Sequence, residues 1–244
     1  RKAILVDHRI KSSPRLLPAQ CPAYIMAGGR SSRFGSDKAR VQVDNRPLLI
    51  ALRRQLIQLG HSVEIVADRE DRYADLGIQC LVDWRPDQGP VAGVVTALQH
   101  RQLQQPGWLL LLSCDLLVWR SAWYEQLSSV LQQRPSAPQS AASEDPGEAR
   151  QNLDAIAFQR DSAVAESQAE PFPSMLHSRL GPCAVALLDR EKRSLRSLFA
   201  EANTATINTP DNPQGWTFNT IEQLHALFLQ ARRRTDNGCK YGCS

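Results

Sequence analysis

The chain has 244 residues, of which 42% are hydrophobic and 22% are charged. This length and composition suit one soluble α/β domain, and they exclude fibrous and small disulfide-rich classes of protein. The six cysteines are spread along the chain rather than packed into a disulfide framework. No apolar run approaches the roughly 20 residues of a membrane span, and the charged opening segment does not read as a signal peptide. We therefore expect a cytoplasmic protein without a membrane partner.

The net charge of +4 is modest for a chain of this length. It does not predict a nucleic-acid partner, although it suits a small anionic substrate. The basic run Arg232–Arg234 is typical of a solvated helix end, where cations complement the helix dipole.

Strands and helices alternate in the first half of the predicted pattern. Apolar runs bounded by turn residues predict strands, and apolar residues at helical spacing predict helices. The predicted strands are 23–27, 62–67, 78–82, 108–113 and 153–158, and the predicted helices are 47–59, 70–76, 91–103, 121–133, 182–189, 194–202 and 221–232. Alternation of this kind predicts a three-layer, Rossmann-like, mostly parallel sheet with helices on both faces.

The predicted domain organisation is simple. Residues 1–20 have no convincing period and are expected to be an irregular extension, and residues 21–232 to form a single domain. Within it, residues 135–150 are rich in proline, serine and acidic residues, which predicts a mobile polar linker. Residues 233–244 are expected to be a tail.

The most informative segment follows the first predicted strand and contains Gly28 and Gly29. Glycines allow close approach of a ligand to the backbone, and successive N–H groups in such a turn can bind an anion. Arg30, Arg33 and Lys38 add cations suited to phosphate oxygens. The loop fits neither the P-loop pattern nor G-x-G-x-x-G, so a P-loop ATPase and a standard dinucleotide site are both disfavoured.

Two carboxylates also follow predicted strands, Asp83 and Asp115. In open α/β sheets, ligands bind outside the carboxyl ends of the strands. Gly28, Asp83 and Asp115 are therefore expected at one edge of the sheet, around one phosphate-rich ligand. Each residue also has a structural interpretation: Lys38 as a solvated lysine, Asp115 as a helix cap and Asp83 as a turn residue. Their shared position at the ends of strands favours a role in ligand binding or catalysis.

The segment from Met26 to Lys38, Met-Ala-Gly-Gly-x-Ser-x-Arg-x-Gly-x-Asp-Lys, resembles the signature loop of nucleotidyltransferases with a nucleoside-diphosphate-sugar-transferase-like fold. Within them, the chain most resembles the molybdenum cofactor guanylyltransferases. Four further segments agree in order and spacing: Asn45–Leu49, Asp83 with Gly89–Gly93, Leu112–Asp115 and Phe218–Thr220. The likeness spans about residues 23–229, apart from the 135–150 linker.

The resemblance implies transfer of GMP from GTP to molybdopterin or its molybdenum-loaded form, with release of pyrophosphate. It implies that the N-terminal half binds GTP and the C-terminal half binds the pterin. Molybdoenzymes or their chaperones are implied as possible further partners.

The resemblance also implies roles for individual residues. Lys38, with Arg33, would neutralise the phosphates, Asp115 would bind Mg²⁺, and Asp83 would contact the nucleoside. The backbone around the nucleotide would come from Met26, Ala27, Gly28 and Gly29, and the floor of the guanine site from Gly89, Pro90 and Gly93.

Some positions depart from the family's pattern. Val66 stands where the family often has a polar residue, and Thr217 stands where a second asparagine is expected beside Asn219. Arg179 is our hypothesis for a residue that binds the acceptor phosphate. The oligomeric state does not follow from the sequence.

Three alternatives remain open from the sequence. One is a related transferase that uses CTP or another phosphorylated acceptor, such as a cobinamide phosphate. Another is a non-catalytic adaptor that binds a nucleotide or a partner, against which the presence of Lys38 and Asp115 counts. A nucleic-acid binder is a weaker third alternative.

Overall fold

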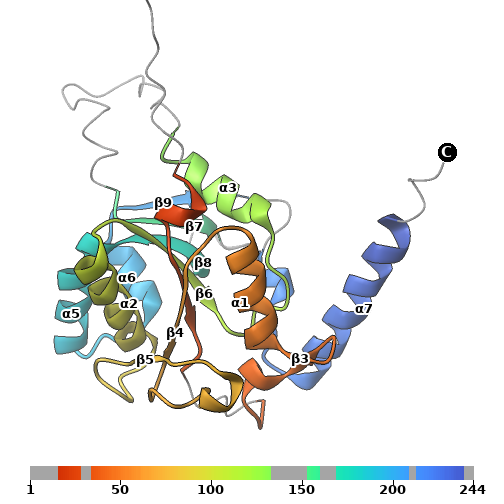
Figure 1. Ribbon diagram of the computed structural model, residues 1–244. Helices are drawn as coiled ribbons and strands as arrows, with labels where there is room; N and C mark the ends of the chain where they lie inside the picture. The colour runs from red at the N-terminus through yellow and green to blue at the C-terminus, as the bar shows by residue number, and fades with distance from the viewer. Residues whose placement is uncertain (1–15, 29–33, 133–152, 160–168, 209–212, 239–244) are drawn as a thin grey trace, which may run out of the picture.

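A seven-stranded sheet forms the centre of the molecule in the computed structural model (Figure 1). The structure describes residues 16–28, 34–132, 153–159, 169–208 and 213–238. The strand order is β5-β4-β1-β6-β8-β7-β9. The strands are β1 (Ala23–Met26), β4 (Val63–Ala67), β5 (Leu81–Val82), β6 (Trp108–Ser113), β7 (Ala155–Gln159), β8 (Ala169–His177) and β9 (Thr204–Ile207).

β8 runs antiparallel to both of its neighbours, whereas every other adjacent pair in this sheet is parallel. The predicted fold class, a mostly parallel sheet with helices on both faces, is therefore confirmed. Because β8 is reversed, its first residues lie at the edge where the parallel strands end. Its last residue, His177, pairs with Trp108 at the start of β6.

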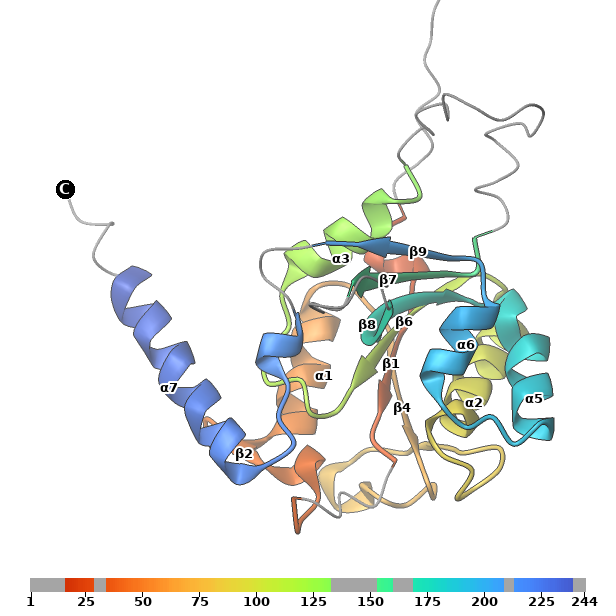
Figure 2. The same cartoon turned by 180° about the vertical axis from the view of Figure 1, so that it is seen from behind.

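Helices cover both faces of the sheet (Figures 1 and 2). On one face, α1 (Leu48–Gln58), α3 (Ser121–Ser129) and the start of α7 (Ile221–Gly238) enclose an apolar core that contains Leu52 and Trp123. On the other face, α2 (Pro90–Gln104), α5 (Gly181–Asp189) and α6 (Leu195–Glu201) enclose a second core that contains Val94, Leu98 and Leu187. The four central residues Leu109–Leu112 of β6 are all fully buried, because they contribute alternately to the two cores.

Short elements complete the fold. They are the 3₁₀ helices η1 (Pro18–Gln20), η2 (Lys38–Arg40), η3 (Ala74–Leu76), η4 (Ser178–Leu180) and η5 (Pro213–Trp216), and the hairpin of β2 (Gln42–Val43) and β3 (Arg46–Pro47). Asn45 lies in the turn of this hairpin with φ of 60°. Asparagine tolerates the left-handed region better than most residues, so it suits this turn position.

Several predicted boundaries were wrong. The third strand is only Leu81–Val82, and the helix predicted at 70–76 is the single 3₁₀ turn Ala74–Leu76. The helix predicted to end at residue 133 ends at Ser129. α7 continues through Gly238, past the expected start of the tail at residue 233.

Four strands, namely β8, β9 and both strands of the β2–β3 hairpin, and part of the N-terminal segment were missed. β8 escaped prediction because Glu170, Pro171 and Pro173 interrupt its apolar pattern, and β9 is short and only partly buried. Residues 16–20 of the expected irregular extension are packed on the domain: the Tyr124 hydroxyl donates a hydrogen bond to the Leu16 carbonyl at 3.1 Å. Residues 1–15 and the predicted 135–150 linker lie outside the described residues.

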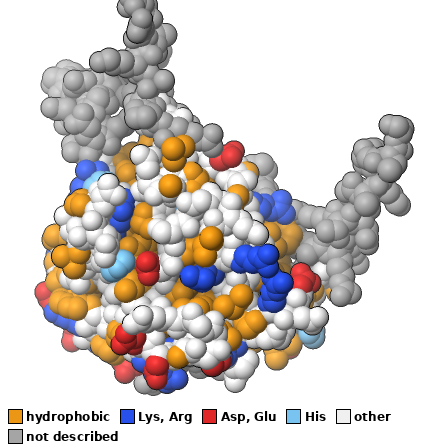
Figure 3. Space-filling model, viewed as in Figure 1, with side chains coloured by type: hydrophobic (Ala, Val, Ile, Leu, Met, Phe, Trp, Pro, Cys, Tyr) orange, Lys and Arg blue, Asp and Glu red, His pale blue; other side chains and the backbone are white. Residues whose placement is uncertain are grey.

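None of the described helices is long and apolar enough to cross a bilayer. On the face of the molecule shown in Figure 3, lysine and arginine side chains form separate small groups with acidic and apolar side chains between them.

Candidate active site

A cavity of about 1250 Å³ opens at the edge where the parallel strands end. It brings together most of the residues singled out from the sequence: Met26, Gly28, Lys38, Asp83, Gly89, Pro90, Gly93 and Asp115 all line it. Ala27 is buried behind this lining. Gly29 and Arg33 lie outside the described residues.

Lys38 connects three distant parts of the chain at this cavity. Its Nζ donates to Asp115 Oδ2 at 3.1 Å and to Asn219 Oδ1 at 2.8 Å. The ammonium also lies 5.8 Å from the centroid of the Phe218 ring. The side chains of Lys38 and Asp115 are only 12% and 17% exposed, so their attraction is screened less than that of a surface pair. The ammonium therefore lies at a defined position, next to the carboxylate at the end of β6.

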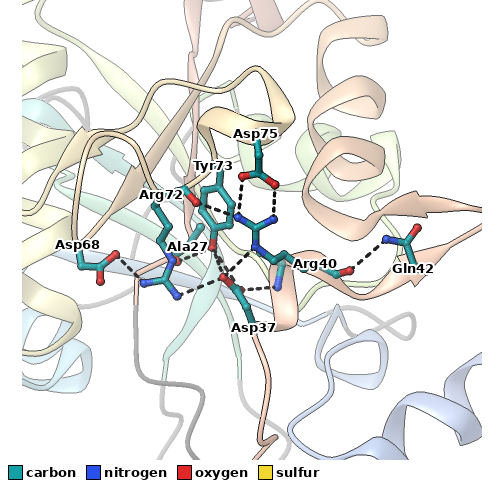
Figure 4. Close-up of polar contacts among 9 residues, drawn as sticks. Ala27, Asp37, Arg40, Gln42, Asp68, Arg72, Tyr73 and Asp75 are labelled. Atoms are coloured by element: carbon teal, nitrogen blue, oxygen red, sulfur yellow. Dashed lines mark hydrogen bonds and ion pairs between the residues drawn. The ribbon is translucent and has the colours of Figure 1, made fainter.

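Asp37, the residue before Lys38, is the centre of a polar cluster (Figure 4). The Ala39 N–H donates to its Oδ1 at 3.0 Å, and Arg72 donates to its Oδ2 at 3.2 Å. The buried Tyr73 hydroxyl lies 3.0 Å from the same carboxylate and 3.1 Å from the Ala27 carbonyl oxygen. Burial and the charge of Asp37 raise the pKa of Tyr73, which keeps the phenol protonated as a donor. These contacts fix the backbone at the end of the glycine loop, and therefore the position of Lys38.

Asp68 and Arg72 also line the cavity, and sequence reasoning missed both. Asp68 is the first residue after β4, so the rule of strand ends that identified Asp83 and Asp115 would also have found it. Arg72 donates to Asp68 Oδ1 at 2.6 Å and thereby links the ends of β4 and the glycine loop. Val66, two residues earlier, is fully buried in β4 and is not among the residues that line the cavity.

Asp83 has an unusual environment at the other end of the cavity. Its Oδ1 is buried and has no hydrogen-bond partner among the described residues. Burial, with a smaller contribution from the charge of Asp68, raises the pKa of Asp83 to about 6. A buried acceptor without a donor costs free energy, so this carboxylate is prepared for a ligand that brings N–H or O–H groups.

Two glycines keep the space around Asp83 open. A Cβ on Gly93 would clash with the Met26 methyl and would lie 2.8 Å from Asp83 Oδ1. Gly89 has φ of 78° and caps the N-terminus of α2, with Pro90 at its first position. The N-terminal end of the α2 dipole supplies a partial positive charge at the cavity wall.

Arg179, our hypothesis for a residue that binds the acceptor phosphate, does not line this cavity. Arg179 follows β8, whose last residue pairs with the first residue of β6, so it lies at the opposite edge of the sheet. Its guanidinium pairs there with Asp154 at 3.0 Å. The reversed direction of β8, which the sequence did not predict, is the reason.

The carboxylates that line the cavity can be compared with the ligands that a magnesium ion prefers. Among the described residues, no three His, Cys, Asp or Glu side chains gather as a metal cluster. Asp115 offers a single carboxylate to a metal ion. The Asp37 carboxylate already accepts hydrogen bonds from the Ala39 N–H and from Arg72. Mg²⁺ keeps several waters and commonly binds one or two carboxylates together with substrate phosphates. Asp115 fits such an ion once a triphosphate supplies the other oxygens.

The sheet order, the glycine turn and the lysine and carboxylates at one edge define a nucleotidyltransferase with a nucleoside-diphosphate-sugar-transferase-like fold. The chain belongs to the MobA-like NTP transferase domain family, whose family model matches residues 23–206. A molybdenum cofactor guanylyltransferase of Vibrio campbellii is 27% identical over 214 residues, which cover 86% of this chain and 95% of that protein. A probable one from Deinococcus radiodurans is 40% identical over 93 residues, 38% of this chain and 46% of its own length.

Solved structures agree on the fold. Molybdopterin-guanine dinucleotide biosynthesis protein A from Archaeoglobus fulgidus superposes with a TM-score of 0.65, covering 87% of this chain and 99% of its own at 15% identity. A 4-diphosphocytidyl-2C-methyl-D-erythritol synthase from Anaerococcus prevotii gives a TM-score of 0.57, covering 86% and 98% at 13% identity. At these identities the likeness concerns the fold alone.

Asp83→Asn should stabilise the free protein near neutral pH. The folded pKa of Asp83 is raised, so its contribution to the free energy of unfolding is largest below about pH 4, where the carboxyl is protonated in both states. That contribution is lost as the pH rises to about 6. We expect the variant to melt about 2–4 °C higher than the parent at pH 7.5, as ~1 kcal/mol would produce after solvent screening, and at the same temperature at pH 4. A pH-independent difference would contradict this account, and Asp71→Asn, at an exposed aspartate, is the control.

Gly93→Ala should disrupt the cavity around Asp83. The added methyl has no room beside Met26 and Asp83, so we expect nucleotide binding, measured by calorimetry, to weaken at least about tenfold. Gly215→Ala is a matched control because its Cβ would meet no atom within 4 Å. Equal affinities for the two variants would show that the nucleotide does not depend on this space.

Proposed function

We propose that this protein transfers GMP from GTP to molybdopterin, or to its molybdenum-loaded form, and releases pyrophosphate. The observation that carries the proposal is that Gly28, Lys38, Asp83 and Asp115 line one cavity together, in a chain of the MobA-like family. The relatives' name, molybdenum cofactor guanylyltransferase, supports transfer of a guanylyl group to this cofactor. The cavity offers a carboxylate for the base and a cation for the phosphates.

In this reaction a terminal phosphate oxygen of the pterin attacks the α-phosphorus of GTP. The new bond is the oxygen–phosphorus bond of the dinucleotide, and the bond to the β-phosphate breaks so that pyrophosphate leaves. An ionised phosphate is already a nucleophile, so the protein need not supply a general base. Catalysis then consists mainly of alignment and charge neutralisation.

Lys38 is proposed to neutralise the phosphates, assisted by Arg33. Its ammonium is held by Asp115 and Asn219 before any substrate binds, so little reorganisation is needed when negative charge moves to the leaving group. Asp115 is proposed to hold Mg²⁺, which when bound would offset charge on the triphosphate oxygens. Gly28 and Gly29, with the backbone of Met26 and Ala27, are proposed to lie along the nucleotide.

Asp83 is proposed to select guanine. The base has neighbouring N1–H and N2–H donors, which suit a carboxylate that only accepts hydrogen bonds. The unpartnered Oδ1 of Asp83 supports this assignment. Cytosine offers one exocyclic amine beside an acceptor nitrogen, which a carboxylate would repel. Gly89, Pro90 and Gly93 are proposed to form the floor of this base site.

Delivery of the product to a molybdoenzyme or its chaperone and a cytoplasmic location remain predictions from the sequence.

Incubation with molybdopterin, Mg²⁺ and each nucleoside triphosphate in turn tests the proposal. We expect pyrophosphate and the guanine dinucleotide with GTP, and at least about tenfold slower turnover with CTP, ATP or UTP, because a site built for particular hydrogen bonds rejects analogues without them. Preference for CTP would overturn the guanine assignment. Nucleotide binding without any product would favour the non-catalytic adaptor.

Replacement of the two charged groups tests their proposed roles. Lys38→Met should lower kcat/KM about 10²–10³-fold, because a preorganised cation is lost from the phosphate site. Asp115→Asn should weaken the dependence of the rate on Mg²⁺. Lys192→Met is a matched control, since Lys192 is a half-exposed surface lysine paired with Glu201. Full activity in Asp115→Asn would mean that the metal binds elsewhere.

A further inference from the structure

Phe172 is the only aromatic side chain among the described residues that line the cavity. It belongs to the first half of β8, the reversed strand that sequence reasoning missed. The side chain is half-buried and packs against the apolar core beneath α2, α5 and α6. One part of the ring is therefore held by the core while the residue still contributes to the cavity wall.

The strand order places Phe172 at the opposite end of the cavity from Asp83. Along the carboxyl edge, Asp83 follows β5, Gly28 follows β1 and Asp115 follows β6, and β8 is next to β6. The register pairs Leu111 with Ser174, and the next residues toward this edge, Ser113 at the end of β6 and Phe172 in β8, both line the cavity. Four strand spacings separate β5 from β8, roughly 19 Å at about 4.8 Å each.

The order of these residues along the cavity matches the order of groups in the proposed product. The base belongs at the Asp83 end, and Lys38 and Asp115 mark the phosphates in the middle, near β1 and β6. The acceptor must then approach from the β8 side, because the nucleoside occupies the β5 side. A dinucleotide has a second ring system beyond its phosphates, and Phe172 lines the cavity on the β8 side.

We propose that Phe172 binds the acceptor by stacking on its fused heteroaromatic ring system. The inference rests on the proposed function and adds a binding residue to it. A phenyl face recognises a flat heteroaromatic ring by offset stacking and by exclusion of water, without a fixed hydrogen-bond pattern. Because the core supports one side of Phe172, little side-chain freedom is lost when the ring is covered.

Phe172→Leu and Phe172→Tyr separate a stacking role from a packing role. Leucine keeps an apolar side chain but removes the ring, whereas tyrosine keeps it. We expect Phe172→Leu to raise the KM for molybdopterin about 5- to 100-fold with the KM for GTP unchanged, and Phe172→Tyr to restore the acceptor KM to within about threefold of the parent. Phe199→Leu, in the same apolar core but not among the cavity residues, is the matched control.

Binding without turnover provides a second measurement. An oxidised, fluorescent pterin phosphate should be quenched on titration with the parent protein and with Phe172→Tyr, and should bind Phe172→Leu correspondingly more weakly. An unchanged acceptor KM and unchanged pterin affinity in Phe172→Leu would overturn the stacking proposal. So would equal increases in both KM values, which would indicate a packing role.

The outcomes also distinguish this inference from the proposed function. If the parent protein forms no dinucleotide from GTP and molybdopterin, the proposed function fails. If it forms the dinucleotide but Phe172→Leu behaves as the parent does, only the assignment of Phe172 fails.

Discussion

The candidate active site depends on the position of one ammonium group. Lys38 begins η2, directly after the loop that follows β1, yet its two hydrogen-bond partners come from the end of β6 and from the segment before α7. Asn219 is 181 residues away in sequence. The cluster around Asp37 holds the backbone on one side of the lysine, and Asp115 and Asn219 hold the side chain on the other. A cation fixed in this way is available for phosphates without first losing its own freedom.

The order of the strands in the sheet sets where the charged groups lie along the cavity. Lys38 and the α2 N-terminus provide positive potential. At the β5 end, the buried Oδ1 of Asp83 accepts no hydrogen bond from the residues that the structure describes. Ionised Asp83 costs stability in the free protein, since its pKa is raised to about 6. Residues that serve a ligand often carry such a cost, because the ligand supplies the missing partner.

The fold class and most of the candidate site could be predicted because local patterns encode them. Gly28, Asp83 and Asp115 each follow an apolar run, and parallel strands bring their ends to one edge. The rest depended on β8, whose prolines hide it from a periodicity argument. Its reversed direction moves Arg179 away from the cavity and brings Phe172 into it. No local pattern within residues 169–177 specifies the direction of this strand, which is set by its pairing with β6 and β7.

The sequence by itself determined the alternation of strands and helices, the glycine turn and the identity of the charged groups at the strand ends. These features follow from side-chain periodicity and from backbone freedom, which are properties of short segments. Only the tertiary structure decided which groups meet: Lys38 with Asn219, and Arg72 with both Asp37 and Asp68. It also leaves Asp83 Oδ1 without a donor within the part of the chain that the structure describes. Such pairings depend on the order of strands in the sheet and on burial, and both arise from the packing of the whole chain.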